Sequence, residues 1–176
     1  MLVGIVGPLS AGKTTVGHLF EKEGFSLVSL SDHLREETEQ QDRETLRALG
    51  NALREEHGPA ILMEKALARS SGDTIFDGIR NPAEVTALQD SGGQIILVDA
   101  DPKLRYDRAM ARGKDTKMSF DAFIEMEAKE ESAKATEQQL HILRNLADFV
   151  ILNDGAEEEL ADEVTRVVLA LRELPK

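Results

Sequence analysis

Residues 7–14 read GPLSAGKT and fit the pattern G-x-x-x-x-G-K-[ST]. An apolar run at residues 2–6 precedes this stretch and a helical pattern over residues 12–23 follows it, which is the strand–turn–helix context of a phosphate-binding loop. Glycines let such a loop curl until its backbone N–H groups point at phosphate oxygens, and the N-terminus of the following helix adds positive potential. An ordinary glycine-rich turn is the alternative, but the match and its context favour a loop that binds a nucleoside triphosphate.

In this phosphate loop, Lys13 is expected to reach the β- and γ-phosphates, and the Thr14 hydroxyl is expected to bind Mg²⁺. ATP is the expected phosphoryl donor. The residues predicted to bind the nucleotide are Gly7, Leu9, Ser10, Ala11, Gly12, Lys13, Thr14 and Thr15.

Short apolar runs alternate with longer helical patterns along the chain. The predicted strands are residues 2–6, 25–30, 74–77, 94–99 and 148–153. Helical patterns cover residues 12–23, residues 32–70 with a break near Gly58-Pro59, the segments after Asn81-Pro82 and from about residue 102, and residues 157–174. The polar, charged stretch before residue 148 carries no predicted element. This alternation predicts an α/β fold in which helices cover both faces of a mostly parallel sheet.

The composition is that of a folded, acidic protein. Apolar residues make up 41% of the 176 residues, enough for a core, and the absence of Cys excludes disulfides and cysteine metal sites. The first residues, MLVGIV, lack the features of a signal peptide, so we expect a cytoplasmic protein. No apolar run approaches the roughly 18 residues of a membrane span, so no membrane partner is expected. The net charge of −12 disfavours nucleic-acid binding, because an acidic surface repels phosphate backbones.

Arginines follow two of the predicted strands. Asp32 and Arg35 come after the second strand, near the sheet edge where open α/β folds bind ligands, although a solvated helix arginine would give the same pattern. Asp77 ends the third strand, where a carboxylate can hold Mg²⁺. Gly78 permits close approach of a ligand and Arg80 projects into the same crevice, whereas a plain Asp-Gly turn is the alternative.

A basic segment stands out in the acidic chain, because residues 101–118 hold six Lys and Arg against three Asp. The spacing of Arg105, Arg108 and Arg112 places them on one helix face, and a polar loop at residues 114–117 follows. This pattern predicts the base of a lid that delivers cations to a transferring phosphoryl group. A salt-bridged surface face with the neighbouring aspartates is the alternative.

A glycine interrupts the helical pattern of residues 42–57 at Gly50, where it costs about 1 kcal/mol against Ala. It permits close approach either to a ligand or to another helix, and the sequence leaves both open.

With the phosphate loop, Asp32-x-x-Arg35, Asp77-Gly78-x-Arg80 and the arginine-bearing lid in this order, the chain resembles the nucleoside monophosphate kinase group of P-loop kinases. More closely, it is similar to archaeal adenylate-kinase-like proteins and their dephospho-CoA-kinase-like and phage deoxynucleotide monophosphate kinase-like relatives. The resemblance covers nearly the whole chain. The runs that match best are SLSDHLREE, DGIRNPAEV and ADFVILNDG, at residues 29–37, 77–85 and 147–155.

The resemblance implies a P-loop NTPase fold, a three-layer αβα sandwich with a five-stranded parallel sheet. It also implies one kinase domain over residues 1–176, with a helical acceptor-binding insert at about 31–70 and a short lid at about 112–135. Arg108 and Arg112 would clamp the donor phosphates, and the backbone from Asn153 to Gly155 would lie beside the donor base. The substrate-binding residues that it implies are Asp32, Arg35, Gly78 and Arg80.

The expected reaction is in-line phosphoryl transfer from ATP to a small acceptor bearing a phosphate, a nucleoside or deoxynucleoside monophosphate. The expected catalytic residues are Lys13, Asp77, Arg80, Arg108 and Arg112. Dephospho-CoA kinase is an alternative, and its hydroxyl acceptor would recruit Asp32 or Asp77 as a base. A nucleotide-binding regulatory protein without turnover is an alternative of another class. For a monophosphate acceptor, Arg35 and Arg80 should face one cavity and lack carboxylate partners.

Overall fold

The computed structural model describes residues 1–36, 38–39, 42–113, 118–130 and 140–175. Within these residues, five strands form one sheet in the order β2-β3-β1-β4-β5, and every neighbouring pair is parallel. The strands are β1 (Leu2–Val6), β2 (Ser26–Ser29), β3 (Thr74–Asp77), β4 (Gln94–Asp99) and β5 (Phe149–Leu152). Because all strands run the same way, the loops that follow them meet at one edge of the sheet.

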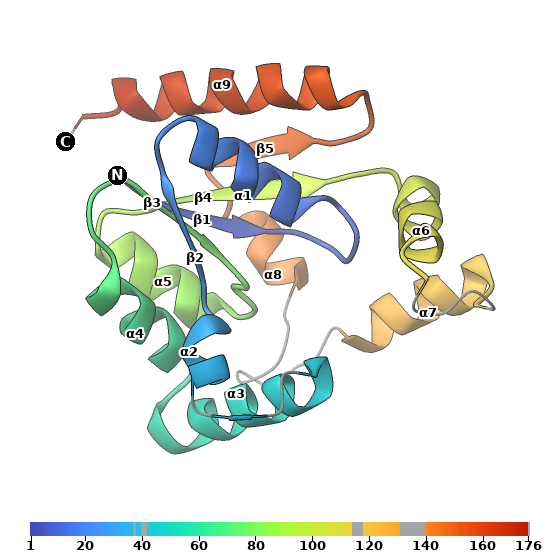
Figure 1. The fold of residues 1–176 in the computed structure, drawn as a ribbon, viewed down its shortest axis with the longest axis horizontal. Coiled ribbons are helices and arrows are strands. Elements are labelled where there is room, and N and C mark those ends of the chain that lie inside the picture. Colours follow the sequence, from blue (N-terminus) through green and yellow to red (C-terminus); the bar gives the residue numbers. More distant parts are fainter. Residues whose placement is uncertain (37, 40–41, 114–117, 131–139, 176) are drawn as a thin grey trace.

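Helices cover both faces of this sheet, as Figure 1 shows. One face carries α1 (Lys13–Lys22) and α9 (Glu157–Glu173), and the other carries α4 (Ile61–Arg69), α5 (Pro82–Asp90) and α8 (Leu140–Asn145). The remaining helices are α2 (Asp32–Glu36), α3 (Arg43–His57), α6 (Pro102–Ala111) and α7 (Phe120–Glu130). The three-layer αβα arrangement expected from the sequence is confirmed.

The core is divided by the sheet into two apolar clusters. Strand side chains alternate between the faces, so in β4 Ile96 and Val98 pack toward α1 and α9, whereas Ile95 and Leu97 pack toward α5. Both sets are buried, and a parallel strand buried on both faces reads as a continuous apolar run. This explains why the strands were visible in the sequence.

Two elements differ from the sequence expectation. The charged stretch before β5 was expected to carry no element, but it contains α7 and α8. Phe123 is the main buried side chain of α7, and Leu143 is that of α8. The long helical pattern of residues 32–70 divides into α2, α3 and α4, and the break predicted near Gly58-Pro59 is confirmed. None of the helices in the described ranges is both long and apolar enough to cross a membrane.

Candidate active site

The phosphate loop connects the end of β1 to the start of α1 and is packed tightly at two glycines. A Cβ on Gly7 would lie 2.0 Å from the carbonyl oxygen of Val98 in β4, so only glycine fits beside that strand. Gly12 has φ 99°, and a Cβ there would lie 2.2 Å from the amide nitrogen of Asn153. Ser10 also has a positive φ, of 59°, and is buried. The loop therefore holds one curled conformation.

Lys13 crosses this loop from the first turn of α1. Its Nζ donates hydrogen bonds to the carbonyl oxygens of Gly7 and Pro8, both at 2.8 Å. No side chain among the described residues caps the N-terminus of α1, and Thr14 and Thr15 are exposed there. The first backbone N–H groups of the helix thus remain available to an anion.

Asp77 lies at the end of β3, beside the central strand β1 that leads into the phosphate loop. One of its carboxylate oxygens accepts a hydrogen bond from the backbone N–H of Gly78 at 2.7 Å. The hydroxyl of Thr14 and the carboxylate of Asp77 are hard oxygen donors, which suit Mg²⁺. The described residues hold no cluster of three or more His, Asp and Glu placed to bind a metal. Mg²⁺ takes few protein ligands, because it keeps water and substrate phosphate oxygens in its coordination shell.

A small cavity of about 160 Å³, the loop cavity, adjoins the phosphate loop on its β5 side. Gly12 and Thr15 line it together with Arg108, Arg112 and Gly155. Arg108 donates from Nη2 to the side-chain oxygen of Asn153 at 3.3 Å, whereas its Nη1 is buried and is without a hydrogen-bond partner among the described residues. A buried cationic donor with unused hydrogens beside a phosphate loop is suited to an anionic ligand.

Asn153 reaches the phosphate loop through its side chain, whereas the resemblance placed its backbone beside the donor base. The residue is 7% exposed and donates from Nδ2 to the carbonyl oxygen of Ala11 at 2.8 Å. Its amide therefore links the end of β5 to the loop and to Arg108.

Arg105 does not share the position of Arg108 and Arg112, so the expectation of three cations facing the phosphoryl group is wrong for this residue. Arg105 is 4% exposed and donates to the carbonyl oxygens of Ala100 and Leu9 at 3.0 and 3.4 Å. It also forms an ion pair with Glu127 of α7. The guanidinium is thus satisfied by the protein, and it joins α6 to the phosphate loop and to α7. Residues 114–117 and 131–135 of the expected lid lie outside the described residues.

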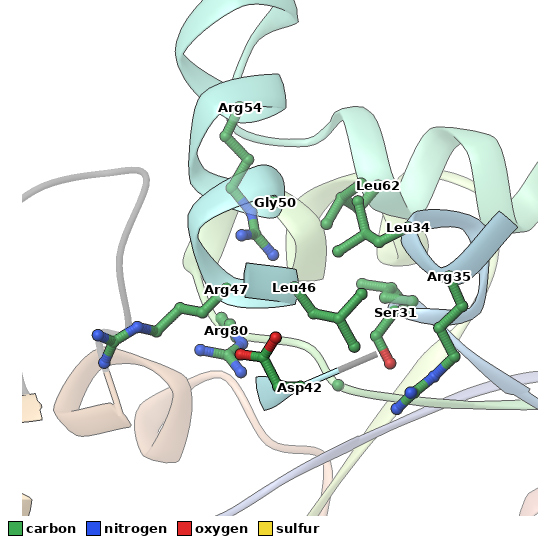
Figure 2. Close-up of a pocket in the computed structure, with 12 residues that line it drawn as sticks. Ser31, Leu34, Arg35, Asp42, Leu46, Arg47, Gly50, Arg54, Leu62 and Arg80 are labelled. Carbon is green, nitrogen blue, oxygen red and sulfur yellow. The ribbon is translucent and has the colours of Figure 1, made fainter. Parts of the chain in front are cut away.

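A larger cavity of about 510 Å³, the arginine cavity, lies at the sheet edge beyond β2 and β3 (Figure 2). The side chains that line it include four leucines and four arginines: Leu30, Leu34, Leu46, Leu62, Arg35, Arg47, Arg54 and Arg80. Gly78 lines it as well. The structure therefore brings Arg35 and Arg80 to one cavity, as expected. Arg47 and Asp42 also line it, and no sequence pattern distinguishes them from their neighbours.

Arg35 departs from the expectation in one respect. Its Nε lies 3.7 Å from a carboxylate oxygen of Asp32, so the expectation of no carboxylate partner is wrong for this residue. The pair is exposed, with 46% of the Arg35 side chain and 60% of the Asp32 side chain accessible, so its energy is small. Asp32 accepts a hydrogen bond from the backbone N–H of Ser29 at 3.2 Å. It is not among the side chains that line the arginine cavity.

Gly50 bears out one of the two alternatives that the sequence left open, close approach to another helix. A Cβ there would lie 3.1 Å from Leu34 and 3.6 Å from Leu62, so the glycine allows α3 to approach α2 and α4 closely. The same residue lines the arginine cavity.

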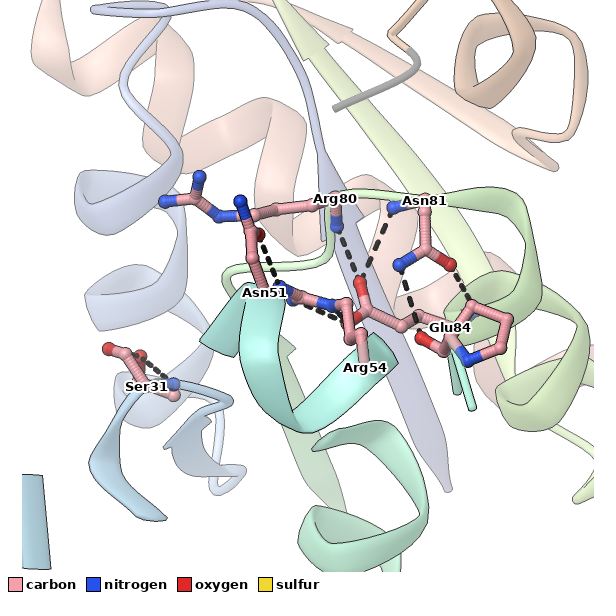
Figure 3. Close-up of polar contacts among 8 residues, drawn as sticks. Ser31, Asn51, Arg54, Arg80, Asn81 and Glu84 are labelled. Carbon is pink, nitrogen blue, oxygen red and sulfur yellow. Dashed lines mark hydrogen bonds and ion pairs between the residues drawn. The ribbon is translucent and has the colours of Figure 1, made fainter. Parts of the chain in front are cut away.

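A buried ion pair between Arg54 and Glu84 lies beside this cavity and was not predicted (Figure 3). Arg54 donates from Nε and Nη2 to one oxygen of Glu84 at 2.9 and 2.7 Å. The other oxygen of Glu84 accepts from the backbone N–H groups of Arg80 and Asn81 at 2.7 and 3.3 Å. Burial raises the pKa of Glu84, and the Arg54 guanidinium and the two N–H groups act against that rise.

The chain was compared with protein families and with solved structures. A family model described as an AAA domain matches residues 3–136. A UPF0200 protein of Pyrobaculum aerophilum is 31% identical over 176 residues, which cover 97% of this chain and 98% of the relative. A UPF0200 protein of Thermococcus kodakarensis is 30% identical over 183 residues and covers 96% of each chain.

Two solved structures have the same fold across nearly the whole chain. Shikimate kinase from Acinetobacter baumannii, solved with shikimate, superposes with a TM-score of 0.63 at 19% identity, covering 98% of this chain and 95% of that one. TT1252 from Thermus thermophilus superposes with a TM-score of 0.60 at 23% identity, covering 100% of this chain and 98% of that one. With a family match over residues 3–136 and relatives across almost its full length, this chain is an AAA-domain protein of the UPF0200 family with the fold of the P-loop kinases.

Proposed function

We propose that this protein transfers the γ-phosphoryl group of ATP to a small acceptor that already carries a phosphate, a nucleoside or deoxynucleoside monophosphate. The observation that carries the proposal is the arginine cavity, which lies at the same sheet edge as the phosphate loop. Its leucines offer an apolar slot for a base, and its arginines offer the bidentate donors that phosphate prefers. Its volume of about 510 Å³ suits a ligand of that size.

The same proposal assigns roles to two segments of the chain. Residues 31–70 supply α2, α3 and α4 and most of the cavity wall, so they serve as the acceptor-binding insert. The segment at about residues 112–135 serves as the lid over the donor. Arg35, Arg80 and Gly78 contact the acceptor, and Asp32 orients Arg35.

The chemistry needs little beyond position and charge. An oxygen of the acceptor phosphate forms a bond to the γ-phosphorus while the bond from that phosphorus to the β–γ bridging oxygen breaks, and ADP leaves. Lys13, Arg108 and Arg112 would neutralise the donor charge, and the acceptor oxygen is already anionic, so no strong base is required. Thr14 and Asp77 would hold Mg²⁺, which would supply further charge neutralisation.

A second candidate is a kinase of a small hydroxyl-bearing molecule, with dephospho-CoA as one example. Asp42 favours it, because its carboxylate lines the arginine cavity and could accept a hydroxyl proton. The solved shikimate kinase, whose structure contains shikimate, has the same fold. A nucleotide-binding regulator without turnover is the candidate of another class.

The deciding experiment is a panel of acceptors. ATP and Mg²⁺ are incubated with each common nucleoside monophosphate, with dephospho-CoA and with shikimate, and ADP release is measured above the acceptor-free rate. We expect turnover with at least one monophosphate. Turnover only with a hydroxyl acceptor would favour the second candidate, and none with any acceptor would favour a regulator.

The arginines give the panel its internal test. Because a lost charge-assisted hydrogen bond is worth about 1.5–3 kcal/mol, Arg35→Ala or Arg80→Ala should raise the acceptor KM about tenfold or more. The KM for ATP should stay within about twofold, since these residues lie apart from the loop cavity. Arg172→Ala, at an exposed position near the end of α9, is the matched control. Equal acceptor KM values in all three variants and the wild type would remove the arginine cavity from the mechanism.

A further inference from the structure

Glu84 is a fully buried carboxylate that joins the start of α5 and the turn before it to α3. It belongs to α5, it is 0% exposed, and its partner Arg54 on α3 is 3% exposed. Four N–H groups surround it, two from the Arg54 guanidinium and one each from the backbone of Arg80 and Asn81. Every one of these contacts is seen in Figure 3.

Helix capping accounts for only part of this arrangement. The side chain of Asn81 caps α5 by accepting from the N–H of Glu84 at 3.1 Å, and in this capping box the Glu84 carboxylate accepts one hydrogen bond in return from the N–H of Asn81. The shorter bond to the N–H of Arg80 and both bonds to Arg54 go beyond that motif. The Asn81 amide also donates to the carbonyl oxygen of Pro59 at 3.2 Å, which ties the turn between α3 and α4 to the same point.

The arginine cavity adjoins this network. Arg80 and Arg54 both line it. Glu84 accepts a hydrogen bond from the backbone of Arg80 and neutralises the charge of Arg54, so Arg54 acts in this network through its contacts with the protein. We propose that Glu84 and Arg54 are positioning residues for the acceptor, and that they fix Arg80 and α3 in one relative geometry around the acceptor phosphate. This inference rests on the proposed function.

Glu84→Gln is the first test, because it keeps the size of the side chain. One amide oxygen can still accept from Arg54, but the amide nitrogen would then face the N–H groups of Arg80 and Asn81 and can accept from neither. We expect the acceptor KM to rise about tenfold or more, with the KM for ATP unchanged and kcat reduced less than KM is raised. Arg54→Lys, which keeps the charge but loses the two-pronged contact, should shift the same parameter in the same direction.

The control is Val85→Ala, at the next residue of α5. Val85 is also 0% exposed, but it packs in the apolar cluster and makes none of the network contacts. Its truncation lowers the stability of the same helix. If Glu84 only stabilises the fold, Val85→Ala and Glu84→Gln should raise the acceptor KM equally when both lower the free energy of unfolding by the same amount. That result would overturn the proposal.

Amide hydrogen exchange separates this inference from the proposed function, since it needs no acceptor. The N–H groups of Arg80 and Asn81 should exchange at least about tenfold faster in Glu84→Gln than in the wild type, and by more than the loss of global stability explains, whereas in Val85→Ala the increase should match the stability loss. Failure of the proposed function would appear as a wild type with no turnover on any monophosphate. Unchanged exchange at both amides, or faster exchange with an unchanged acceptor KM, would refute the positioning role itself. If Glu84→Gln does not fold, the same measurements on Arg54→Lys decide the matter.

Discussion

Lys13 is the residue whose loss should affect the donor most. Its Nζ bonds to two loop carbonyl oxygens, and it is absent from both apolar clusters, so the fold should survive Lys13→Ala. We expect phosphoryl transfer to be abolished and triphosphate affinity to fall, because no other loop side chain can neutralise the β- and γ-phosphates. Calorimetric titration with a non-hydrolysable ATP analogue and circular dichroism measure the two effects. Near-wild-type turnover by the folded variant would refute the role of the phosphate loop.

Asp77 should matter for rate more than for nucleotide affinity. Asp77→Asn keeps the oxygen that accepts from Gly78 but removes the charge that would attract Mg²⁺. We expect kcat to fall and the Mg²⁺ concentration needed for half-maximal activity to rise, while the Kd of the ATP analogue changes less. Activity should also disappear when a chelator removes the metal. Asp90→Asn, an exposed residue at the end of α5, is the control. An unchanged kcat at saturating Mg²⁺ would exclude Asp77 as a metal ligand.

Residues could be predicted from the sequence where the motif is local. The phosphate loop and Asp77-Gly78-x-Arg80 are short runs, and their functional residues stand close together in the sequence. The pair of Arg54 and Glu84 is not local, because 30 residues separate the partners and nothing in the sequence distinguishes Arg54 from Arg47. The run from Asn81 to Glu84 could have been read as a capping box, but the depth at which Glu84 lies comes from packing alone.

Elements were predictable in proportion to their buried apolar surface. Strands β1, β3 and β4 have the predicted bounds because each is buried on both faces, whereas α7 and α8 were missed. Few of the described side chains of these two helices are buried, so charged residues mask their pattern. The division of residues 32–70 into three helices was missed in part, because the turn before α3 depends on Asp42 capping the N–H of Thr45.

The contact between β5 and the phosphate loop yields a prediction about two elements at once. Gly12→Ala should lower triphosphate affinity and stability for two reasons: a φ of 99° costs about 1–2 kcal/mol for a residue with a Cβ, and that Cβ would meet Asn153. Gly24→Ala is the matched control, because Gly24 has φ 95° with nothing within 4 Å of the added Cβ. It should show the backbone penalty alone in urea denaturation.

A double-mutant cycle isolates the steric part. Asn153→Ala should partly rescue Gly12→Ala, because it removes the colliding amide, although alone it weakens affinity by breaking the bonds to Ala11 and Arg108. Strictly additive effects of the two substitutions on the free energy of unfolding would show that the contact is not formed in solution.

Across the whole molecule, the two cavities lie on opposite sides of the central strand, β1. The residues of the loop cavity follow β1, β4 and β5, those of the arginine cavity follow β2 and β3, and β1 lies at the centre of the sheet. A compound that joins two nucleosides through a polyphosphate should therefore occupy both cavities and raise Tm more than ATP or the monophosphate does alone. Thermal unfolding with each compound at equal concentration measures this. Arg80→Ala should lose the added stabilisation, and a shift no larger than that of ATP in the wild type would show that the cavities are not occupied together.

The leucines of the arginine cavity have a consequence for how such a protein can evolve. Leu34, Leu46 and Leu62 line that cavity and are also buried members of the apolar cluster beneath it. Replacing a buried Leu by Ala costs about 2–5 kcal/mol, a large part of the 5–15 kcal/mol that keeps a typical domain folded. A lineage that drifts toward a bulkier acceptor by shortening these side chains must therefore gain stability elsewhere first. Changes confined to the polar rim, at positions such as Arg47, carry no such penalty and are open to selection at any time.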